Sequence, residues 1–531
     1  MEFIIVSPLK SIMSDRQAIW AFVLGCVGVT AGVLLHAPMF AMAHEMGMGY
    51  QLANMPMDAS MIFGMFTIVA GVGVAAYGLL PRNIALQRKA AGSIDIVAPE
   101  DVPLSFAHWR LMIVLIVALI IDVMKPATLG FTVPGMVAEY EISKATASLV
   151  PFSALCGTVT GSIVWGIIAD IYGRKATILL SAVMFVGTSI CGAMPSLNWN
   201  IAMCFLMGLA AGGMLPVTYA LLAEMMPSRH RGWALVMVGG LGAAGGYFAA
   251  SGLSALLQPI FGWRILWLMN LPTGLLLILL GGYIPESAKF LIARGRLLEA
   301  EAVMRLFGSV ARKHVDTPPS PALGTVMPQE AQYTAKLVAL CIAAIAWGLV
   351  NFGLLLWLPA DMVAKGNSVA GSSKLLAASA LIAFPTIFVA ALMYSRWSTK
   401  WSLTAMMAVT IVGLIGVLQF ELTGGSPILP VALLIVGTNG IIAILLPYAA
   451  ETFPMRVRGR ATGMVAACTK GGGFLAQILS ILAMVPPMEV VAGAIVAPSA
   501  VALGLVAWYG RETRGRDLRE MDATVLPSSS D

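Results

Sequence analysis

Three ionisable side chains lie inside long apolar runs of the sequence, where each charge costs about 2.5–3.5 kcal/mol on membrane-insertion scales. Asp122 and Lys125 are three residues apart and therefore share one helix face, on which they can neutralise each other. Lys470 has no acidic neighbour in its own run and precedes the glycines 471–473, where we expect the backbone to open towards a cavity. Lys470 is either a substrate contact or a second partner of Asp122.

The three charges together favour an anionic ligand. If all are ionised, two lysines against one aspartate leave one positive charge in the apolar core, and a buried cation without an anion loses its proton. A carboxylate would supply that anion at Lys125 and Lys470, while Asp122 would alternate between Lys125 and a proton. The pattern predicts a site for a small organic anion, coupled to protons.

Neutral side chains are expected to complete this site. Asn351 and Gln477 either contact the substrate or form hydrogen bonds between helices. The aromatic residues expected to shape the cavity are Phe131, Trp165 and Trp347.

A second group of charges lies between the apolar runs 145–169 and 176–195 and reads G-x-x-x-D-x-x-G-R-K. We expect its first glycine to let a neighbouring helix approach closely, its aspartate to face the N-terminus of another helix, and its second glycine to form a tight turn. A charge pair here would lock one conformation and break in another. The alternative is that the cations only anchor the loop in the cytoplasm. The residues are Gly166, Asp170, Gly173, Arg174 and Lys175.

The pattern A-E-x-x-P-x-R-x-R-G occurs at 223–232 and again at 450–459, each time after the fourth apolar run in a group of six. This recurrence indicates two six-helix halves related by an internal repeat, with a substrate site between them near mid-membrane. The charged residues of the repeat join the predicted gating set: Glu224, Arg229, Arg231, Glu451, Arg456 and Arg458.

The segment between the first two apolar runs is rich in methionine and histidine. Thioether and imidazole ligands suit Cu(I), but methionine also packs adaptably at a membrane surface, and the chain has 33 methionines. Both interpretations stay open, with packing favoured. The candidate ligands are His36, Met39, Met42, His44, Met46 and Met48.

Composition explains how these side chains are positioned. The chain has 531 residues, of which 59% are hydrophobic and only 11% charged, against about 25% charged in a typical soluble domain. A membrane-spanning helix needs about 20 apolar residues, and fourteen runs qualify. The predicted spans are 17–37, 59–80, 109–136, 145–169, 175–195, 199–224, 233–257, 265–284, 335–358, 372–394, 402–420, 428–449, 460–484 and 490–509.

These spans predict an all-α membrane protein made of two helices followed by six and six. The expected parts are an extra N-terminal pair (1–90), a cytoplasmic linker (91–108), a first half (109–284), a central cytoplasmic loop (285–334), a second half (335–510) and a cytoplasmic tail (511–531). We expect the extra pair to be dispensable for the twelve-helix fold.

The distribution of cations sets the orientation. Of the 32 Lys and Arg residues, only Lys144, Arg264, Lys365 and Lys374 fall on outer loops when the loop of Asp170 faces inwards. This positive-inside pattern predicts a multi-pass protein of the plasma (inner) membrane with both termini in the cytoplasm. No N-terminal basic region with a cleavage site is evident, so a removable signal peptide is not expected.

Other classes of protein find little support. The six cysteines lie in apolar runs and form no C-x-x-C pair, so neither disulfides nor zinc are indicated. No G-x-x-x-x-G-K-[ST], H-E-x-x-H or G-x-S-x-G motif occurs, so we expect no ATP use, no enzymatic activity and no cofactor. The net charge of +6 does not indicate nucleic acid, because the cations gather at one side of the predicted membrane.

The loop of Asp170 resembles the signature loop between the second and third helices of the major facilitator superfamily. Residues 285–291 with Gly295-Arg296 resemble the segment after the sixth helix of sugar porters, and residues 512–516 are similar to their C-terminal E-T-x-G-R motif. The resemblance covers about residues 106–520. It implies the major facilitator fold, here with two extra N-terminal helices, and secondary active transport by alternating access.

Within that superfamily the chain most resembles the aromatic-acid/proton symporters, a metabolite:H⁺ symporter branch. Lys125 stands where their first span has the second Asp of D-G-x-D, and Cys204 stands where their fourth span has an Arg. The signature loop of the second half reads Y-S-R-W-S-T-K at 394–400. The family's substrate and coupling residues are therefore not transferred to this chain.

Three functions follow as hypotheses. The first is transport of a small organic carboxylate with protons. The second is efflux of a drug or toxic metabolite, for which a positively charged cavity would be unfavourable. The third is a copper-linked transporter or membrane sensor that uses the extra helix pair.

Overall fold

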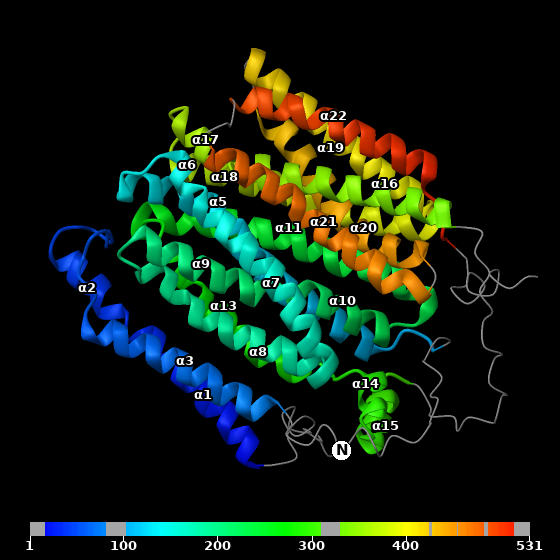
Figure 1. Cartoon of the computed structure of the whole chain (residues 1–531), viewed down its shortest axis with the longest axis horizontal. Coiled ribbons are helices and arrows are strands. Elements are labelled where there is room, and N and C mark those ends of the chain that lie inside the picture. The colour runs from blue at the N-terminus through cyan, green and yellow to red at the C-terminus, as the bar shows by residue number, and fades with distance from the viewer. Residues whose placement is uncertain are drawn as a thin grey trace, which may run out of the picture. The chain divides into compact units, whose positions relative to one another are not determined.

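The computed structural model describes residues 16–80, 102–308, 330–423, 427–453, 455–482 and 487–514, and all regular elements in these ranges are helices (Figure 1). Among the described residues, 14 helical spans are long and apolar enough to cross a membrane. Each coincides with one of the fourteen predicted spans, which confirms that count. The linker from 91 to 101, the Pro-rich part of the central loop and the tail beyond 514 lie outside the described residues.

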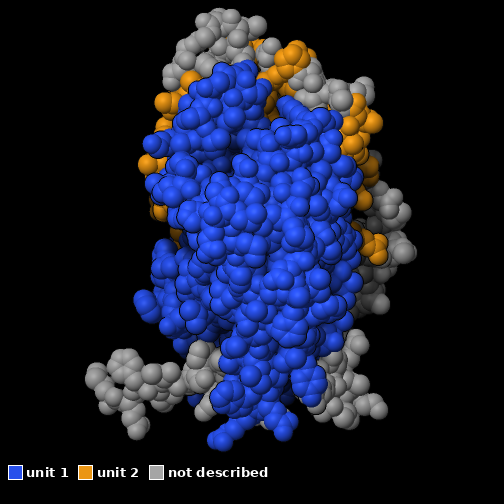
Figure 2. Space-filling model, turned by 90° about the vertical axis from the view of Figure 1, so that its left-hand side faces the viewer, with its two compact units in different colours: residues 1–231, 245–313, 359–377 blue, residues 232–244, 314–358, 378–531 orange. Residues whose placement is uncertain are grey.

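The chain divides into two compact units, coloured separately in Figure 2. The first comprises residues 1–231, 245–313 and 359–377, and the second comprises residues 232–244, 314–358 and 378–531. The predicted boundary between two six-helix halves stays a prediction, because three helices each contribute to both units. These are α11 (Ser228–Phe261), α17 (Leu358–Ala364) and α18 (Val369–Leu392).

The helices assigned mainly to the first unit follow in chain order. They are α1 (Arg16–Leu34), α2 (Ala37–Glu45), α3 (Ala59–Leu79), α5 (Phe106–Tyr140), α6 (Lys144–Ala147), α7 (Leu149–Tyr172), α8 (Arg174–Gly187), the 3₁₀ helix η1 (Thr188–Ala193), α9 (Leu197–Ala211), α10 (Met214–Met225), α11 (Ser228–Phe261), α12 (Ile265–Leu268), α13 (Asn270–Leu280), the 3₁₀ helix η2 (Gly281–Tyr283), α14 (Ala288–Ala293), α15 (Leu297–Leu306) and α17 (Leu358–Ala364).

The second unit contains the C-terminal helices. They are α16 (Glu330–Gly348), the π-helix η3 (Leu349–Leu355), most of α18 (Val369–Leu392), the π-helix η4 (Met393–Trp397), α19 (Thr399–Thr423), α20 (Ile428–Thr452), α21 (Met455–Ile481) and α22 (Met488–Tyr509).

Helices α1 and α3 form a tight antiparallel pair that packs on α8 (Figure 1). A Cβ added to Gly71 would lie 2.7 Å from the nitrogen of Val29, and one added to Gly64 would lie 2.7 Å from the carbonyl oxygen of Gly32. Only glycine permits this approach, as at other helix contacts in membranes. The pair shares one hydrophobic core with α8, so 94% of the apolar window of the Arg174–Ala193 span is buried.

Glycine also brings α16 and α21 together in the second unit. A Cβ on Gly348 would lie 3.1 Å from the Cα of Gly472, and directly after this contact α16 changes into the π-helix η3. Helix α21 stays regular through residues 471–473. The expected opening of the backbone at these glycines is therefore wrong, since Gly472 serves helix contact while the irregular backbone lies in η3.

Candidate functional site

The turn between α7 and α8 is capped by a distant carboxylate. Gly173 has φ of +103°, which confirms the predicted tight turn. The Arg174 amide donates to Oε1 of Glu286 at 2.8 Å, and the Lys175 amide donates to Oε2 at 3.2 Å. A Cβ on Gly173 would collide with this carboxylate. Glu286 therefore satisfies free amides of α8 and complements the positive end of the helix.

The side chain of Arg174 lies in a charge network beside this cap. Its Nη2 donates to Oε1 of Glu224 at 2.9 Å and lies 3.7 Å from Oδ1 of Asp170. The Glu224 side chain is 20% exposed, whereas that of Asp170 is 79% exposed. Since exposed ion pairs contribute little, Glu224 is the main partner of Arg174 in this structure. Lys175 is buried at the start of α8.

The second unit repeats the cap. Oε1 of Glu512 accepts hydrogen bonds from the amide and the hydroxyl of Thr399, at 3.0 and 2.7 Å, and the Ser398 hydroxyl donates to Oε2. Thr399 begins α19, the third span of the second six. Glu451 lies close by, and its Oε2 accepts from the Tyr394 hydroxyl at 2.6 Å. The family motifs drew attention to Glu286 and Glu512, but their capping role was not predicted.

The two capping carboxylates differ in their pKa. Burial raises the pKa of Glu286, although hydrogen bonds from the Ser287, Arg174 and Lys175 amides oppose that rise. Partial burial alone would also raise the pKa of Glu512. Hydrogen bonds from Ser398 and Thr399 outweigh it and lower the pKa to about 2.

The remaining members of the predicted gating set lie at the start of α11, in α21 and in α7. Arg229 is exposed and Arg231 is half-buried at the start of α11. The side chains of Arg456 and Arg458 lie outside the described residues. A Cβ on Gly166 would meet nothing within 4 Å, so the expected helix contact at this glycine is wrong. The close approach of α7 to α9 occurs one to two turns earlier, at Gly161 and its neighbours.

Asp122 and Lys125 are both buried in α5, with 6% and 1% of their surface exposed. The Lys125 Nζ lies 2.8 Å from the centroid of the Phe185 ring on α8, a cation–π contact. This Nζ has no hydrogen-bond partner among the described residues. The structure thus places both charges inside the first unit, on one face of one helix as predicted.

Lys470, Asn351 and Gln477 come together around η3 in the second unit. The Lys470 Nζ lies 5.2 Å from the centroid of the Phe352 ring, and Asn351 is the residue before Phe352. The Gln477 Nε2 donates to the Phe352 carbonyl at 2.7 Å, and its Oε1 accepts from the Trp357 indole at 3.3 Å. Gln477 of α21 thereby links η3 to the following Trp357, and π-helical turns such as η3 are frequent at functional sites.

The predicted aromatic residues hold helices together. The Trp165 indole donates to the carbonyl of Leu209 at 2.6 Å, and the Trp347 indole donates to the carbonyl of Thr438 at 2.8 Å. Phe131 is buried and lies 6.0 Å from the ring of Tyr247. Of the three, Trp347 is nearest to the candidate site, since its ring lies 5.8 Å from that of Phe352.

The outer residues of the N-terminal pair fall into two groups. His36 and Met39 are buried, with 1% and 5% of their surface exposed. The remaining candidates are exposed, and the His44 ring stacks on that of Tyr50. These are Met42, His44, Met46 and Met48.

A buried ion pair between the end of α5 and the start of α12 was not predicted. The Arg264 Nη2 donates to Oε1 of Glu139 at 2.7 Å, and both side chains are at most 4% exposed. The same oxygen accepts from the amides of Leu52 and Ala53, at 2.8 and 3.0 Å. The loop between α2 and α3 is therefore bound to α5. Sequence counting treated Arg264 only as an outer cation, because its partner is far away in the chain.

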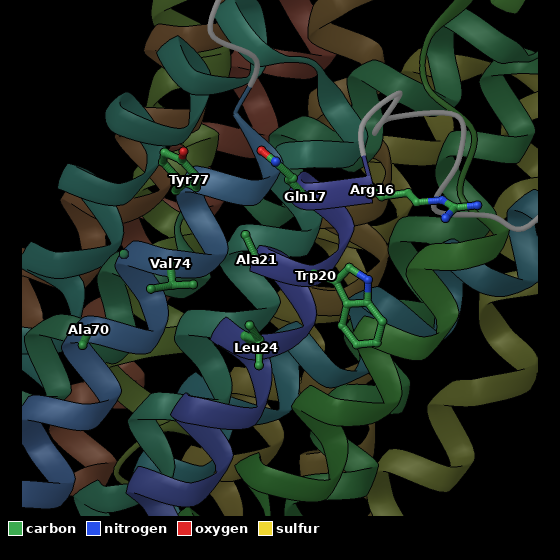
Figure 3. A pocket seen from close by; sticks show the side chains of 9 residues that line it. Arg16, Gln17, Trp20, Ala21, Leu24, Ala70, Val74 and Tyr77 are labelled. Atoms are coloured by element: carbon green, nitrogen blue, oxygen red, sulfur yellow. The ribbon is translucent and has the colours of Figure 1, made fainter.

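A shallow groove of about 690 Å³ runs along α1 and α3 (Figure 3). Its lining residues are Arg16, Gln17, Trp20, Ala21, Leu24, Ala70, Gly73, Val74 and Tyr77. None of these belongs to the candidate site.

Comparison with known proteins identifies transporters as relatives of this chain. The chain is 25% identical over 400 residues to the niacin transporter NiaP of Acinetobacter baylyi, covering 73% of this chain and 90% of that one. It is 28% identical over 440 residues to the 4-hydroxybenzoate transporter PcaK of Pseudomonas aeruginosa, covering 77% and 94%.

A solved structure gives the same fold. The xylose transporter XylE from E. coli, in a partially occluded inward open conformation, matches with a TM-score of 0.62 at 14% identity, covering 78% of this chain and 100% of that one. The family model described as Major Facilitator Superfamily matches residues 111–477. The chain is thus a multi-pass membrane transporter and belongs to the Major Facilitator Superfamily.

Proposed function

We propose that this transporter carries a small aromatic carboxylate together with protons, and that Lys470 binds the carboxylate. The observation that carries the proposal is the position of the Lys470 ammonium on α21. It lies 5.2 Å from the ring of Phe352, a residue of the π-helix η3 that follows α16. A cation beside an aromatic face suits a ligand that has both a ring and an anionic group.

The relatives support this substrate class. Niacin and 4-hydroxybenzoate, which two relatives are named for transporting, are both planar rings with a carboxylate. Phe352 and Trp347 supply aromatic surface in the same unit, Asn351 supplies a polar group, and Gln477, which is 0% exposed, holds η3 in place through the Phe352 carbonyl. The ring would stack on the aromatic residues while the carboxylate pairs with Lys470.

Asp122 and Lys125 are proposed to serve the proton. The Asp122 carboxylate alternates between two states: it either binds a proton or pairs with the ammonium of Lys125, three residues away on the same helix. Since Lys125 is 1% exposed and lies over Phe185, its part is to stabilise Asp122, and any direct substrate contact needs a movement of α5 or α8.

The gating role is proposed for the network of Arg174. Breaking the pair with Glu224 would release the side chain at the start of α8 from α10, while Glu286 continues to cap α8. In this proposal the protein lies in the inner membrane with both termini in the cytoplasm, as the distribution of Lys and Arg indicates.

The test is uptake into proteoliposomes under an imposed pH gradient. We expect labelled niacin or 4-hydroxybenzoate to accumulate when the outside is acidic, and Lys470→Gln to abolish most of that uptake. Lys470→Arg keeps the charge and should retain part of it. Lys374→Gln, which removes an exposed lysine, should transport normally.

Transport assays with neutral compounds distinguish carboxylate transport from the alternative, efflux of a toxin. The proposal predicts that nicotinamide, which lacks the carboxylate, is carried poorly by the wild type and equally poorly by Lys470→Gln. If a neutral or cationic compound is carried and its transport survives Lys470→Gln, the carboxylate proposal fails.

A further inference from the structure

His36 lies buried between α1 and α3 at the end of their glycine contact. Successive contacts pair Gly25 with Gly71 and Gly32 with Gly64, as expected for antiparallel helices. His36 follows Gly32 by one helical turn, and a Cβ on Gly64 would lie 2.8 Å from its Cε1. The ring is therefore fixed against α3, with 1% of the residue exposed.

The hydrogen bonding of His36 defines its tautomer. The Nδ1 lies 2.9 Å from the carbonyl oxygen of Gly32. Because a carbonyl only accepts hydrogen bonds, Nδ1 carries the proton and donates it. The Nε2 of the neutral ring then carries a lone pair, and this atom is buried with no hydrogen-bond partner among the described residues.

A buried lone pair without a partner is costly. Leaving such an acceptor unsatisfied costs about 1–3 kcal/mol, and native structures rarely keep one without a reason. An imidazole whose Nδ1–H is held by a backbone carbonyl, with Nε2 left open, has the arrangement of a metal-binding histidine. The ring of His36 is thus oriented as a ligand.

Two buried methionines neighbour this contact. Met39 follows His36 by three residues, and Met61 precedes Gly64 by three residues in α3, which places Met61 on the helix face of Gly64. They are 5% and 0% exposed and belong to the same buried cluster of the α1–α3 pair. Met46, by contrast, is 63% exposed.

We propose that His36 Nε2 and the thioethers of Met39 and Met61 bind one Cu(I) ion. Imidazole and thioether are soft or borderline ligands that favour Cu(I) over Zn²⁺ or Ca²⁺. No group of three or more His, Cys, Asp or Glu side chains in the described part of the chain is arranged for a harder ion. In this proposal the ion is bound by the buried His36, Met39 and Met61. It reaches them along the exposed residues Met42, Met46 and Met48.

This site is independent of carboxylate transport. It lies on the extra helix pair, and none of its residues belongs to α5, η3 or α21. Copper binding can therefore be tested whether or not the substrate proposal holds.

The experiment measures Cu(I) retained by the full-length purified protein. The protein is loaded with Cu(I) under reducing, anaerobic conditions, desalted and analysed for copper, and its affinity is measured by competition with a chromogenic Cu(I) chelator. We expect one Cu(I) per chain. X-ray absorption should show a first shell of one nitrogen and two sulfur atoms. Ag(I), a redox-inert substitute, should raise the thermal midpoint.

Matched variants separate the buried site from the exposed loop. Met39→Leu with Met61→Leu keeps the volume of the core, and we expect it to weaken Cu(I) binding by at least about tenfold, in line with the losses seen when metal-site residues are removed. His36→Leu should do the same. Met42→Leu with Met46→Leu should keep the affinity of the wild type. Absence of stoichiometric Cu(I) in the wild type, or unchanged affinity in the Met39→Leu/Met61→Leu protein, would overturn the proposal.

Discussion

Glu139 and Arg264 form a buried ion pair with an N–O distance of 2.7 Å, and the same carboxylate oxygen holds the loop between α2 and α3 through two backbone amides. Arg264 also donates to the carbonyls of Gly192 and Met194 at 2.9 and 2.8 Å. This ion pair thus connects α5, the end of η1, the start of α12 and the loop between α2 and α3. The extra pair is fixed to the first unit by polar contacts as well as by its apolar face.

Glu139→Gln should destabilise the protein strongly. Removing one member of a buried pair leaves the other charge uncompensated, which costs about 3–5 kcal/mol. We expect a lower thermal midpoint in detergent, and a cysteine placed at Asn54 should become more reactive as the loop is released. Glu141→Gln, two residues away and exposed, is the matched control. An unchanged midpoint in Glu139→Gln would contradict this account.

Glu224→Gln should slow transport more than Asp170→Asn. Both carboxylates face Arg174, but Glu224 lies at 2.9 Å and is mostly buried, whereas Asp170 lies at 3.7 Å and is mostly exposed. Initial rates in proteoliposomes, normalised to protein amount, measure the difference. Equal rates in the wild type and Glu224→Gln would remove this pair from the gating mechanism. If Asp170→Asn lost more of the transport rate than Glu224→Gln, Asp170 would be the more important partner of Arg174, as the signature motif leads one to expect.

Glu512 should stabilise the protein less as the pH falls. Its folded-state pKa of about 2 lies below its ordinary value of 4.5, so the unfolded chain binds the proton more readily. The stabilising contribution of Glu512 to the free energy of unfolding is present above pH 4.5 and is lost as the pH falls from there towards 2. Thermal midpoints of the wild type and Glu512→Gln, compared from about pH 7 to about pH 3, should converge on acidification.

Glu286→Gln serves as a control, because the contribution of Glu286 to stability should change with pH in the opposite direction to that of Glu512. Burial raises the pKa of Glu286 above 4.5, so its contribution is present below that pH and declines as the pH rises through the folded-state pKa. The wild type should therefore lose stability relative to Glu286→Gln as the pH rises. Parallel pH profiles for the two variants would refute the assignment of opposite pKa shifts.

Removal of residues 1–80 should lower stability without preventing membrane insertion. The sequence suggested that the pair is dispensable for the twelve-helix fold, but in the structure it shares a core with α8 and binds Glu139. Lipid can cover the apolar face of α8, so insertion should persist. The measurement is the thermal midpoint of the truncated protein in detergent and in lipid nanodiscs. A midpoint equal to that of the full chain in detergent would support dispensability.

The spans were predictable because hydropathy and length alone define them. Gly173 was also predictable, since a turn between two cations and an apolar run needs a residue that tolerates positive φ. Gly166 was misread because a glycine in a motif does not reveal what faces it, and here nothing lies within 4 Å. The interruption at η3 follows Gly348 and contains Gly353, but the chain has 54 glycines, so a glycine alone does not mark it.

The polar contacts of the site were harder to predict for a physical reason. Glu286 and Arg174 are 112 residues apart, and Glu139 and Arg264 are 125 apart. Helix periodicity carries no information about such distant partners. Lys470 could be found because a lone charge in an apolar run is visible locally, but its neighbour Phe352 could not.

The caps of α8 and α19 have a consequence for how related chains are recognised. Glu286 follows the span Ile265–Tyr283 and binds the first turn of α8, and Glu512 follows the span Val490–Tyr509 and binds the first turn of α19, although one turn reads G-R-K and the other S-T-K. The side chains of the two turns differ, whereas a carboxylate that holds the backbone amides is present at both. The predicted repeat of six helices would account for this likeness. We expect distant relatives to be better aligned on the capping carboxylate than on the basic motif it supports.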